Sequence, residues 1–559
     1  MAKIDRKEYT KEEVISKMTM KQLKKVARWL YDLSAPYKKK ILFFTIWGII
    51  NVGLGLLYIW LTKSIIDIAT NAQIGNFWLI AFVLIALSLF QISAQYLVGY
   101  YGAKFSVEVS NGVRYKMFAT VLRSKWYEQE KFHTGDILTR IKQDASEVVG
   151  FLVSSFPSFV ITFVQLIASF IFLFYLDKML ALIILCVSPI FFLFSKLYVF
   201  KMRKYSLQLK KIGSDMNSML QESVQHQVVV KTLEYQEPNL NQLGEIQDFF
   251  KFITLKRTKF GLNLRSVFTF GFSGGYMVAF LWGVYQLKLS AISFGTLTAF
   301  LQLVNKIQGP VAGLIGIIPG FINVYTAVER LLELEDMSTE EKGDPVNLGE
   351  GISIDFTDVT FAYDKEPVLK SLNLHFEAGE FTAIIGETGC GKTTVMRLML
   401  ALLEPQKGQI LLKKGSRSEA VSALTRCNFI YVPQGNTLFS GTIRDNLRMA
   451  KENATDKEME DVLRVAVADF VFDLPQGIDT SLQEFGQGLS EGQAQRIGLA
   501  RSLLRGGNIL LLDEVTSAVD ELTESKIIQN LRVFAKDKTV IFVTHRLKIA
   551  DKCDKVIKM

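Results

Sequence analysis

Cysteine is scarce in this chain of 559 residues. The four cysteines, Cys186, Cys390, Cys427 and Cys553, have neither a disulfide spacing nor that of a zinc site, so the sequence predicts neither feature. Cys390 lies in a glycine-rich loop, which suits a reducing compartment. A cleavable signal pattern is also missing, because residues 3–25 mix basic, acidic and polar types before any apolar run.

The composition indicates two unlike halves. Hydrophobic residues make up 49% of the chain and charged residues 21%, with a net charge of +9. This blend is too apolar for a large soluble enzyme and too charged for a protein wholly embedded in a membrane. We therefore expect four parts: an N-terminal cytosolic segment over 1–40, a membrane domain over 41–332, a polar linker over 333–350 and a soluble domain over 351–559.

Six apolar runs are long enough to cross a membrane as helices, which takes about 20 residues. They are residues 41–62, 77–100, 152–176, 179–199, 264–287 and 294–322. An even number of spans places both termini on one side. Lys and Arg crowd residues 3–40, 104–142 and 201–259, which predicts cytoplasmic termini in a plasma (inner) membrane. The positive charge then faces anionic lipid headgroups, and no nucleic-acid partner is needed.

The two long basic inner segments, 104–142 and 201–259, are expected to continue the spans as helices. We expect their turns near Gly135 and Glu237, where a soluble domain could be contacted. Before the first span, residues 21–33 place apolar side chains on one helical face and lysines on another. This pattern predicts an elbow helix lying at the membrane interface, with an ordinary solvated helix as the alternative. The apolar residues of this face are Val26, Trp29, Leu30 and Leu33.

Polar residues inside the spans are candidates for a substrate path. Gln302, Asn305 and Lys306 follow i, i+3, i+4 spacing in the sixth span and so share one helical face. Gln165 is a further candidate in the third span. Polar residues in spans tend to face a cavity or a neighbouring helix, so hydrogen bonding between helices explains them nearly as well.

The soluble half carries a phosphate-binding pattern. An apolar strand from Phe381 leads into "GETGCGKT" and then into a helix, which is the context that the G-x-x-x-x-G-K-T motif requires. The backbone of the loop would close on the phosphates of ATP, Lys392 would reach the β and γ oxygens, and the Thr393 hydroxyl would bind Mg²⁺. The predicted nucleotide-binding residues of this run are Gly386, Glu387, Thr388, Gly389, Cys390, Gly391, Lys392, Thr393 and Thr394.

Two further strands end in candidate catalytic residues. "NILLLDE", residues 508–514, is continuously apolar, as is typical of a buried parallel strand, and ends in two carboxylates. Asp513 is predicted to hold Mg²⁺ and Glu514 to polarise an attacking water. Alone, this pair could equally begin a helix. His545 ends the strand pattern "TVIFVTHR", at the edge of the sheet where ligands collect, and is predicted to contact the γ-phosphate.

Together these motifs resemble an ATP-binding cassette (ABC) exporter, and the likeness covers nearly the whole chain. The order of the phosphate loop, "YVPQ", "LSEGQ", "LLLDE", "SAVD" and "VTHR" carries the resemblance, with six spans before it. It implies an α-helical membrane domain with six transmembrane helices plus an α/β P-loop NTPase domain of the ABC type. The chain would be a half-transporter that works with a second copy or with a different subunit.

The resemblance also implies roles for individual residues. Two cassettes would stack head to tail, so that the signature segment of one, "GLSEGQAQR" (488–496), covers the γ-phosphate held by the other. Ser490, Gly492 and Gln493 would thus complete the partner's site. The remaining implied roles are adenine stacking by Tyr363, sensing of Mg²⁺ and of the attacking water by Gln434, and communication across the dimer by Asp520.

Two departures from the family pattern bear on turnover. Glu491 stands where the commonest signature has glycine, and Phe485 stands where exporters commonly have arginine. Both leave open whether the partner is identical or different. The leading hypothesis is an ATP hydrolase that exports or flips an amphipathic or hydrophobic substrate, such as a lipid, peptide or drug. An ATP-gated channel or regulatory membrane subunit is the alternative.

Overall fold

The computed structural model describes residues 20–132, 134–364, 366–387, 389–483 and 488–559. It divides into two compact units. The first unit comprises the described residues up to Val121 and from 134 to Asp336. The second unit comprises Leu122–Phe132 together with the described residues from Met337 to Met559.

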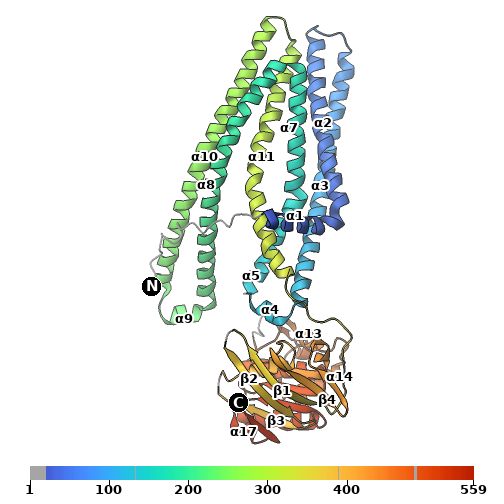
Figure 1. Ribbon diagram of the computed structural model, residues 1–559, viewed down its shortest axis with the longest axis vertical. Helices are drawn as coiled ribbons and strands as arrows, with labels where there is room; N and C mark the ends of the chain where they lie inside the picture. Colours follow the sequence, from blue (N-terminus) through green and yellow to red (C-terminus); the bar gives the residue numbers. More distant parts are fainter. Residues whose placement is uncertain (1–19, 133, 365, 388, 484–487) are drawn as a thin grey trace. The chain divides into compact units, whose positions relative to one another are not determined.

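Long helices make up the first unit (Figure 1). Each of the six predicted spans lies in one helical run. Four runs within the described residues are long and apolar enough to cross a membrane: Gln22–Ala69, Phe77–Arg123, Thr134–Leu176 and Gln236–Lys288. The long helices are α2 (Lys38–Ala69), α3 (Phe77–Arg123), α7 (Phe156–Leu176), α8 (Lys178–Gln225), α10 (Gln236–Lys288) and α11 (Phe294–Glu335).

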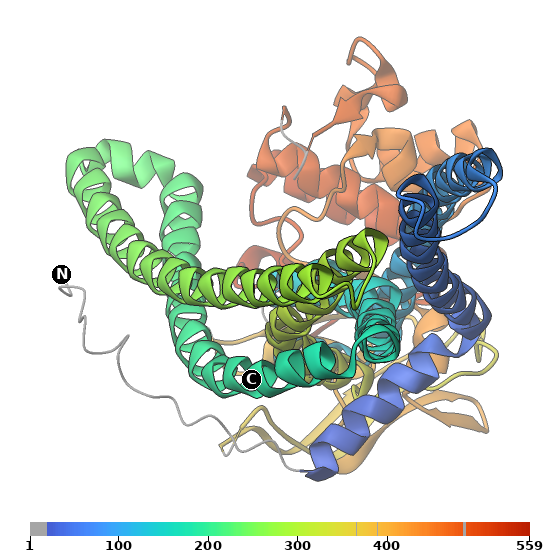
Figure 2. The ribbon, with the colours of Figure 1, turned by 90° about the horizontal axis from the view of Figure 1, so that it is seen from above.

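Several of these helices continue far beyond a membrane, as the basic inner segments predicted. α10 has 53 residues, which at 1.5 Å per residue is about 80 Å against a hydrocarbon core of about 30 Å. α8 and α10 form a hairpin that is set apart from α2 and α3 (Figure 2). Before α7, the chain runs through α5 (Thr134–Thr139), a π-helical segment at Arg140–Asp144, α6 (Ala145–Gly150) and a second π-helical segment at Phe151–Ser155.

Of the two turns that join the long helical extensions, the first lies earlier in the chain than expected. The first is the short helix α4 (Trp126–Glu130), so the predicted turn near Gly135 is wrong: Gly135 lies inside α5. The reason is that Lys125 donates its N–H to Ser338 O at 2.8 Å, which ties the chain to the second unit before it reaches the glycine. The second turn contains α9 (Gln227–Thr232), and Glu237 already belongs to the first turn of α10.

The predicted elbow helix is α1 (Met20–Ser34), which lies across the long helices (Figure 2). Val26, Trp29 and Leu33 are buried, which confirms the apolar face. Trp29 Nε1 donates a hydrogen bond to Glu335 at the end of α11, so α1 packs on protein along this face.

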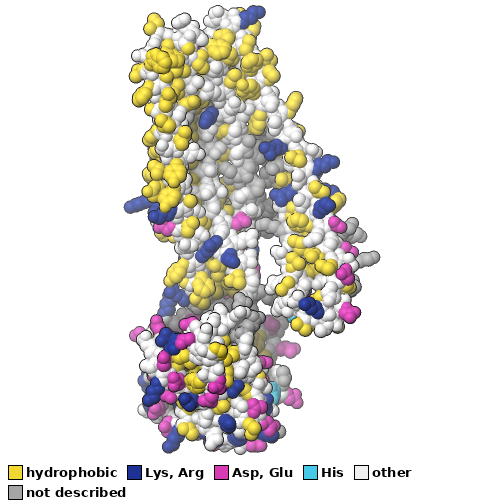
Figure 3. All heavy atoms as spheres, turned by 180° about the vertical axis from the view of Figure 1, so that it is seen from behind, with side chains coloured by type: hydrophobic (Ala, Val, Ile, Leu, Met, Phe, Trp, Pro, Cys, Tyr) yellow, Lys and Arg dark blue, Asp and Glu magenta, His cyan; other side chains and the backbone are white. Residues whose placement is uncertain are grey.

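Apolar side chains cover the outer surface of α2 and α3. Figure 3 shows yellow side chains gathered on this face of the first unit, with Lys and Arg at its lower end in this view. Exposed aromatic rings on a membrane helix are suited to contact with lipid. The exposed rings include Trp60, Trp78, Phe82 and Tyr96.

The described residues of the second unit form two larger sheets and a two-stranded one, in which β7 pairs with β8. β1 pairs with β2 and β4 in an antiparallel sheet of order β2-β1-β4-β5, and a parallel sheet has the order β11-β3-β10-β9-β6. All five residues of β9 and of β10 are buried, as expected of central parallel strands. The strands are β1 (Ser353–Ala362), β2 (Pro367–Phe376), β3 (Phe381–Ile385), β4 (Lys407–Lys414), β5 (Arg417–Ala420), β6 (Phe429–Val432), β7 (Gly441–Thr442), β8 (Ser481–Leu482), β9 (Ile509–Asp513), β10 (Thr539–Val543) and β11 (Lys555–Lys558).

Helices pack around the parallel sheet and bury the main core of the second unit. They are α12 (Lys392–Met399), α13 (Ile443–Arg448), α14 (Asp456–Val465), α15 (Glu491–Leu504), α16 (Glu521–Phe534) and α17 (Leu547–Ala550).

A close approach fixes the start of α11 against the end of α2. Asp67 is buried, forms an ion pair with Lys63 at 2.7 Å and accepts the N–H of Gly295 at 3.0 Å. A Cβ on Gly295 would lie 2.4 Å from both Asp67 Oδ1 and the backbone oxygen of Lys63. Only glycine therefore fits at this crossing.

We expect Gly295→Ala to destabilise the membrane unit by about 1–3 kcal/mol, because the backbone oxygen of Lys63 cannot give way. The measurement is the unfolding temperature of the purified chain in detergent. Gly53→Ala is the control, since a Cβ there meets nothing within 4 Å. Equal unfolding temperatures for both variants would contradict the proposed close contact.

Candidate functional site

The phosphate loop connects β3 to α12, as the sequence predicted. Gly389 and Gly391 have φ values of +90° and +105°, a backbone region that side-chain-bearing residues rarely adopt. The buried Lys392 folds back, and its Nζ donates to the backbone oxygens of Gly386 and Glu387, each at 2.9 Å. The lysine is thus held by the rim of the loop, where phosphate oxygens can replace those acceptors. Thr388 lies outside the described residues.

The three predicted catalytic residues come together. Glu514 Oε2 accepts a hydrogen bond from Gln434 Nε2 at 2.8 Å, and Glu514 Oε1 lies 3.0 Å from His545 Nε2. Glu514 itself has a φ of +49°, unusual for a residue with a side chain, and donates its N–H to Val543 O at 3.0 Å. This backbone conformation turns the carboxylate out of the strand direction and between its two partners.

Asp513, the last residue of β9, is buried beside Glu514. Burial and the negative charge of Glu514 raise the pKa of its carboxyl group to about 6, against the opposing effects of Arg397 and Lys392. Tyr431 also donates a hydrogen bond to this group, and burial raises the pKa of that phenol to about 12. A desolvated carboxylate held in this way is stabilised by any cation that reaches it.

These residues fit a magnesium ion. Mg²⁺ prefers oxygen ligands and usually takes one or two carboxylates plus substrate phosphates. The Asp513 carboxylate, the Thr393 hydroxyl and the Gln434 amide oxygen offer this donor set beside the phosphate loop.

Arg397 links the nucleotide site to α4. Its Nη1 donates to Tyr363 Oη at 3.1 Å, and its guanidinium carbon lies 4.6 Å from the centre of the Trp126 ring. Tyr127 Oη donates to the backbone oxygen of Tyr363 at 2.9 Å. The Tyr363 hydroxyl also lies 3.3 Å from Thr394 Oγ1, in the helix that follows the phosphate loop. Tyr363, the predicted adenine-stacking residue, is therefore fixed from both sides.

The signature segment starts α15 with a capping box. Ser490 Oγ accepts the N–H of Gln493 at 3.2 Å, and Gln493 Oε1 accepts the N–H of Ser490 at 2.9 Å. Gly492 is buried, and a Cβ there would lie 2.5 Å from Ala518 O, so packing alone demands glycine at this position. Glu491 is exposed at the helix start, whereas Phe485 lies outside the described residues.

Asp520 caps the next helix, because its Oδ2 accepts the N–H of Thr523 at 3.0 Å. This hydrogen bond lowers the pKa of the Asp520 carboxyl group. The signature segment and Asp520 thus lie on neighbouring helix starts, joined through the contact of Gly492 with the segment before Asp520.

Comparison with known proteins decides the family. Residues 41–311 match the family model of the ABC transporter transmembrane region, and residues 369–517 match the ABC transporter model. The chain belongs to the ABC transporter family. Its fold class is confirmed, and ATPase-coupled transport is the activity that the family membership implies.

Relatives of this ABC transporter chain extend over nearly its whole length. Proteins named "Putative multidrug export ATP-binding/permease protein" in several strains of Staphylococcus aureus are 28% identical over 541 residues, covering 93% of each chain. The structure of a bacterial Atm1-family ABC exporter with ATP bound is similar in fold, with a TM-score of 0.81, 21% identity and 94% coverage of each chain. The chain is thus a half-transporter of a family that works as a dimer.

The membrane unit of this ABC transporter contains two adjoining cavities. The smaller, of about 250 Å³, is lined by Gln165 and Lys306 of the predicted substrate path. Gln165 Nε2 lies 3.4 Å from the backbone oxygen of Lys306, at the limit of a hydrogen bond. Gln302 and Asn305 share the helix with Lys306 but are not among the lining residues of either cavity.

The larger cavity, of about 620 Å³, contains polar residues that the sequence reading missed. Gln91 and Gln95 of α3 and Asn51 of α2 line it, and Asn51 lines the smaller cavity as well. The sequence contains a pattern that could have identified two of them. Gln91 and Gln95 are spaced i, i+4 in a largely apolar run and so lie on one face of the helix.

We expect Asp513→Asn to raise the unfolding temperature of the chain in magnesium-free buffer, because it removes a buried negative charge. The pKa of Asp513 in the folded chain, about 6, exceeds the ordinary value of 3.8. The buried charge therefore costs no folding stability below pH 3.8, and its full cost applies above pH 6. It is on the order of 3 kcal/mol, and the gain at pH 5 should be about half of that at pH 8. Asp461→Asn, at an exposed site, is the control. The same gain at both pH values would contradict the buried-charge explanation.

We expect Trp126 and Arg397 to be energetically coupled. In a double-mutant cycle of Trp126→Leu and Arg397→Met, the unfolding free energies should deviate from additivity by about 1 kcal/mol, because either change removes the same cation–π contact. Trp126→Leu combined with Arg464→Met, which lies over the ring of Phe472, provides an additive control. Additive losses in both cycles would show that the first contact contributes nothing.

Proposed function

We propose that this chain is one half of an ATP-driven exporter that moves an amphipathic or hydrophobic molecule across the plasma membrane. Alternating access of the membrane cavity would follow closure and opening of two cassettes around ATP. The observation that carries the proposal is the position of Glu514, hydrogen-bonded to Gln434 and 3.0 Å from His545 beside the phosphate loop.

The residues divide the hydrolytic step among them. Lys392 leaves its loop carbonyls to neutralise the β and γ oxygens of ATP, while the loop N–H groups hold the phosphate chain. Glu514 takes a proton from the attacking water as the water oxygen bonds to the γ-phosphorus and the bond to the ADP oxygen breaks. Gln434 and His545 hold that carboxylate in place and contact the water and the γ-phosphate. Mg²⁺, when bound by Asp513 and Thr393, supplies charge neutralisation on the phosphates.

A second cassette would complete each site. The N-terminus of α15 presents backbone N–H groups and the positive end of a helix dipole, which suits the γ-phosphate of a partner's ATP. The Ser490 Oγ accepts the Gln493 N–H in the capping box. Its O–H can still donate a hydrogen bond to that phosphate, because a hydroxyl group both accepts and donates. The proposed contacts are the same for an identical partner and for a different one.

Orientation and cargo follow from charge and surface. Lys and Arg crowd the segments that join the inner ends of the spans, which supports cytoplasmic termini. The aromatic outer surface of α2 and α3 supports contact with membrane lipids. The cavities join apolar and polar linings, which supports an amphipathic lipid, peptide or drug as cargo, in keeping with the multidrug export named for the Staphylococcus aureus relatives.

We expect Glu514→Gln to lower ATP turnover by about 10²–10⁴-fold, because a neutral amide cannot accept the proton of the attacking water. The measurement is phosphate release by the purified chain in lipid nanodiscs, with the mass of the particle determined on the same sample. ATP binding should persist, since Lys392 and the phosphate loop are intact.

Turnover from a particle with two copies, lost in Glu514→Gln, would establish a self-sufficient homodimer. ATP binding without turnover in the unchanged chain would indicate that a different subunit is needed. A Glu514→Gln chain that hydrolyses ATP like its parent would refute the assigned base, and turnover that no cargo alters would favour an ATP-gated channel.

A further inference from the structure

No carboxylate among the described residues forms an ion pair with the positively charged Lys306. It lies in α11, well inside the membrane-spanning stretch, and forms no ion pair with any residue that the structure describes. A Cβ on Gly55 would lie 3.6 Å from Lys306 Nζ, so the ammonium group reaches from α11 to van der Waals distance of α2.

The sequence of the spans explains the missing partner. Not one Asp or Glu occurs in residues 41–62, 77–100, 152–176, 179–199, 264–287 or 294–322, whereas Lys196, Arg265 and Lys306 do. An identical partner chain would bring no carboxylate in its spans either. Because an unpaired charge at membrane depth is costly, basic residues there usually face a ligand or a water-filled path.

A second polar group that lines the same cavity as Lys306 is also unsatisfied. Ser169 is fully buried, and its Oγ has no hydrogen-bond partner among the residues that the structure describes. It lines the same small cavity as Lys306, together with Asn51 and Gln165. Buried hydroxyl groups nearly always have a partner, so an orphaned one that borders a cavity points to a missing acceptor.

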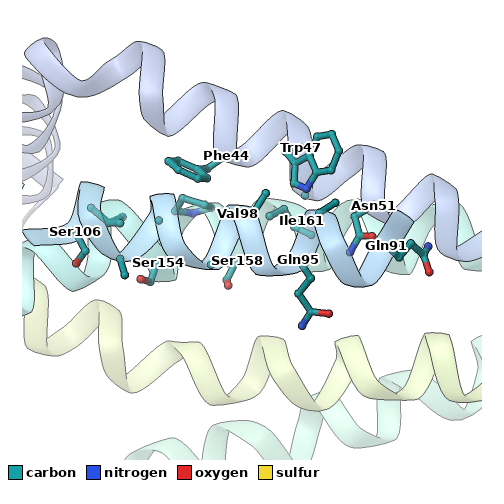
Figure 4. A pocket seen from close by; sticks show the side chains of 17 residues that line it. Phe44, Trp47, Asn51, Gln91, Gln95, Val98, Ser106, Ser154, Ser158 and Ile161 are labelled. Carbon is teal, nitrogen blue, oxygen red and sulfur yellow. The ribbon is translucent and has the colours of Figure 1, made fainter. Parts of the chain in front are cut away.

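The larger cavity continues from this polar end and is uncharged. It shares Gly48, Asn51 and Ile161 with the smaller one, and its described lining includes no Lys, Arg, His, Asp or Glu. Figure 4 shows the rings of Phe44 and Trp47 on α2 at one side of this cavity. A volume of about 620 Å³ lies within the ordinary range for small-molecule sites.

We propose that the two cavities together bind an amphipathic anion. Its carboxylate, sulfonate or phosphate group would pair with Lys306 Nζ, and rotation of the Ser169 side chain about χ1 would let Oγ donate a hydrogen bond to the same group. Its apolar or aromatic body would lie in the uncharged cavity against Phe44 and Trp47. This inference rests on the proposed function, because it names the chemical class of the cargo.

The test uses two fluorescent probes that differ only in the anionic group. They are 8-anilino-1-naphthalenesulfonate and its neutral counterpart N-phenyl-1-naphthylamine. Binding to the full chain in phosphatidylcholine nanodiscs is measured by equilibrium dialysis, with empty nanodiscs subtracted. We expect Lys306→Met to weaken sulfonate binding about 10-fold or more and to leave the neutral probe unchanged, because a charge-assisted contact is lost.

Three further variants make the result specific. Lys306→Arg should retain sulfonate binding because it keeps the charge, and Lys288→Met, at the end of α10, should leave both probes unchanged. Ser169→Ala should weaken sulfonate binding about 3–10-fold without affecting the neutral probe. It removes an unsatisfied hydroxyl and is therefore expected to fold.

Several results would overturn the proposal. The first is equal sulfonate binding by the parent chain and by both Lys306→Met and Ser169→Ala. The second is a parallel loss of both probes in Lys306→Met, and the third is no sulfonate binding by the parent chain. If Lys306→Met does not assemble, unchanged sulfonate binding by Ser169→Ala overturns it by itself.

Two additional arms separate the sources and the hypotheses. Loss of sulfonate binding in nanodiscs that contain phosphatidylglycerol would identify a lipid headgroup as the natural anion, and retention would identify a soluble amphiphile. Movement of the probes is measured separately in proteoliposomes. Lys306-dependent binding without ATP-dependent movement would support the anion site and contradict export. ATP-dependent movement of the neutral probe alone, independent of Lys306, would support export and contradict the anion site.

Discussion

The guanidinium group of Arg397 is the contact on which both the nucleotide site and helix α4 depend. It stacks over Trp126, donates to the hydroxyl of Tyr363 and opposes the rise in the pKa of Asp513. An arginine can serve all three because it is planar, permanently charged and carries several donors in fixed directions. Arg397 therefore contacts both the nucleotide site and α4, which follows α3 in the chain after the non-helical residues Ser124 and Lys125.

The signature segment shows a second constraint, because capping and packing within its own chain already dictate its residue types. The capping box satisfies the Ser490 and Gln493 N–H groups, and Gly492 is required by its approach to Ala518 O. The N–H groups of Glu491 and Gly492 have no acceptor inside the helix, as at any helix start. Folding thus accounts for the residue types here, and it leaves these two N–H groups to acceptors outside the helix.

The strands of the cassette and the meeting of Gln434, Glu514 and His545 were predictable, because each motif combines a local pattern with a fixed place at a sheet edge. The first inner turn was not. Gly135 looked like the turn, but a glycine inside a helix is tolerated. What sets the turn is the set of contacts that Lys125, Trp126 and Tyr127 make with residues far along the chain. That contact joins residues more than 230 positions apart for Tyr127, and no local pattern carries it. Likewise, helical spacing grouped Gln302 and Asn305 with Lys306, but only the packing of α2 and α7 against α11 decides which side chain borders a cavity.

Lys392 and Lys306 differ in the acceptors that the chain offers to their ammonium groups. Lys392 is buried, and its Nζ donates to two backbone oxygens of its own loop. Lys306 is exposed within the chain and has no ion-pair partner among the residues that the structure describes, and the spans around it contain no carboxylate. An ammonium group at membrane depth needs acceptors as much as a buried one does, so the two lysines differ in where those acceptors come from. In the cassette, the backbone of the phosphate loop supplies acceptors for Lys392. In the membrane unit, the proposed anionic ligand supplies the acceptor for Lys306.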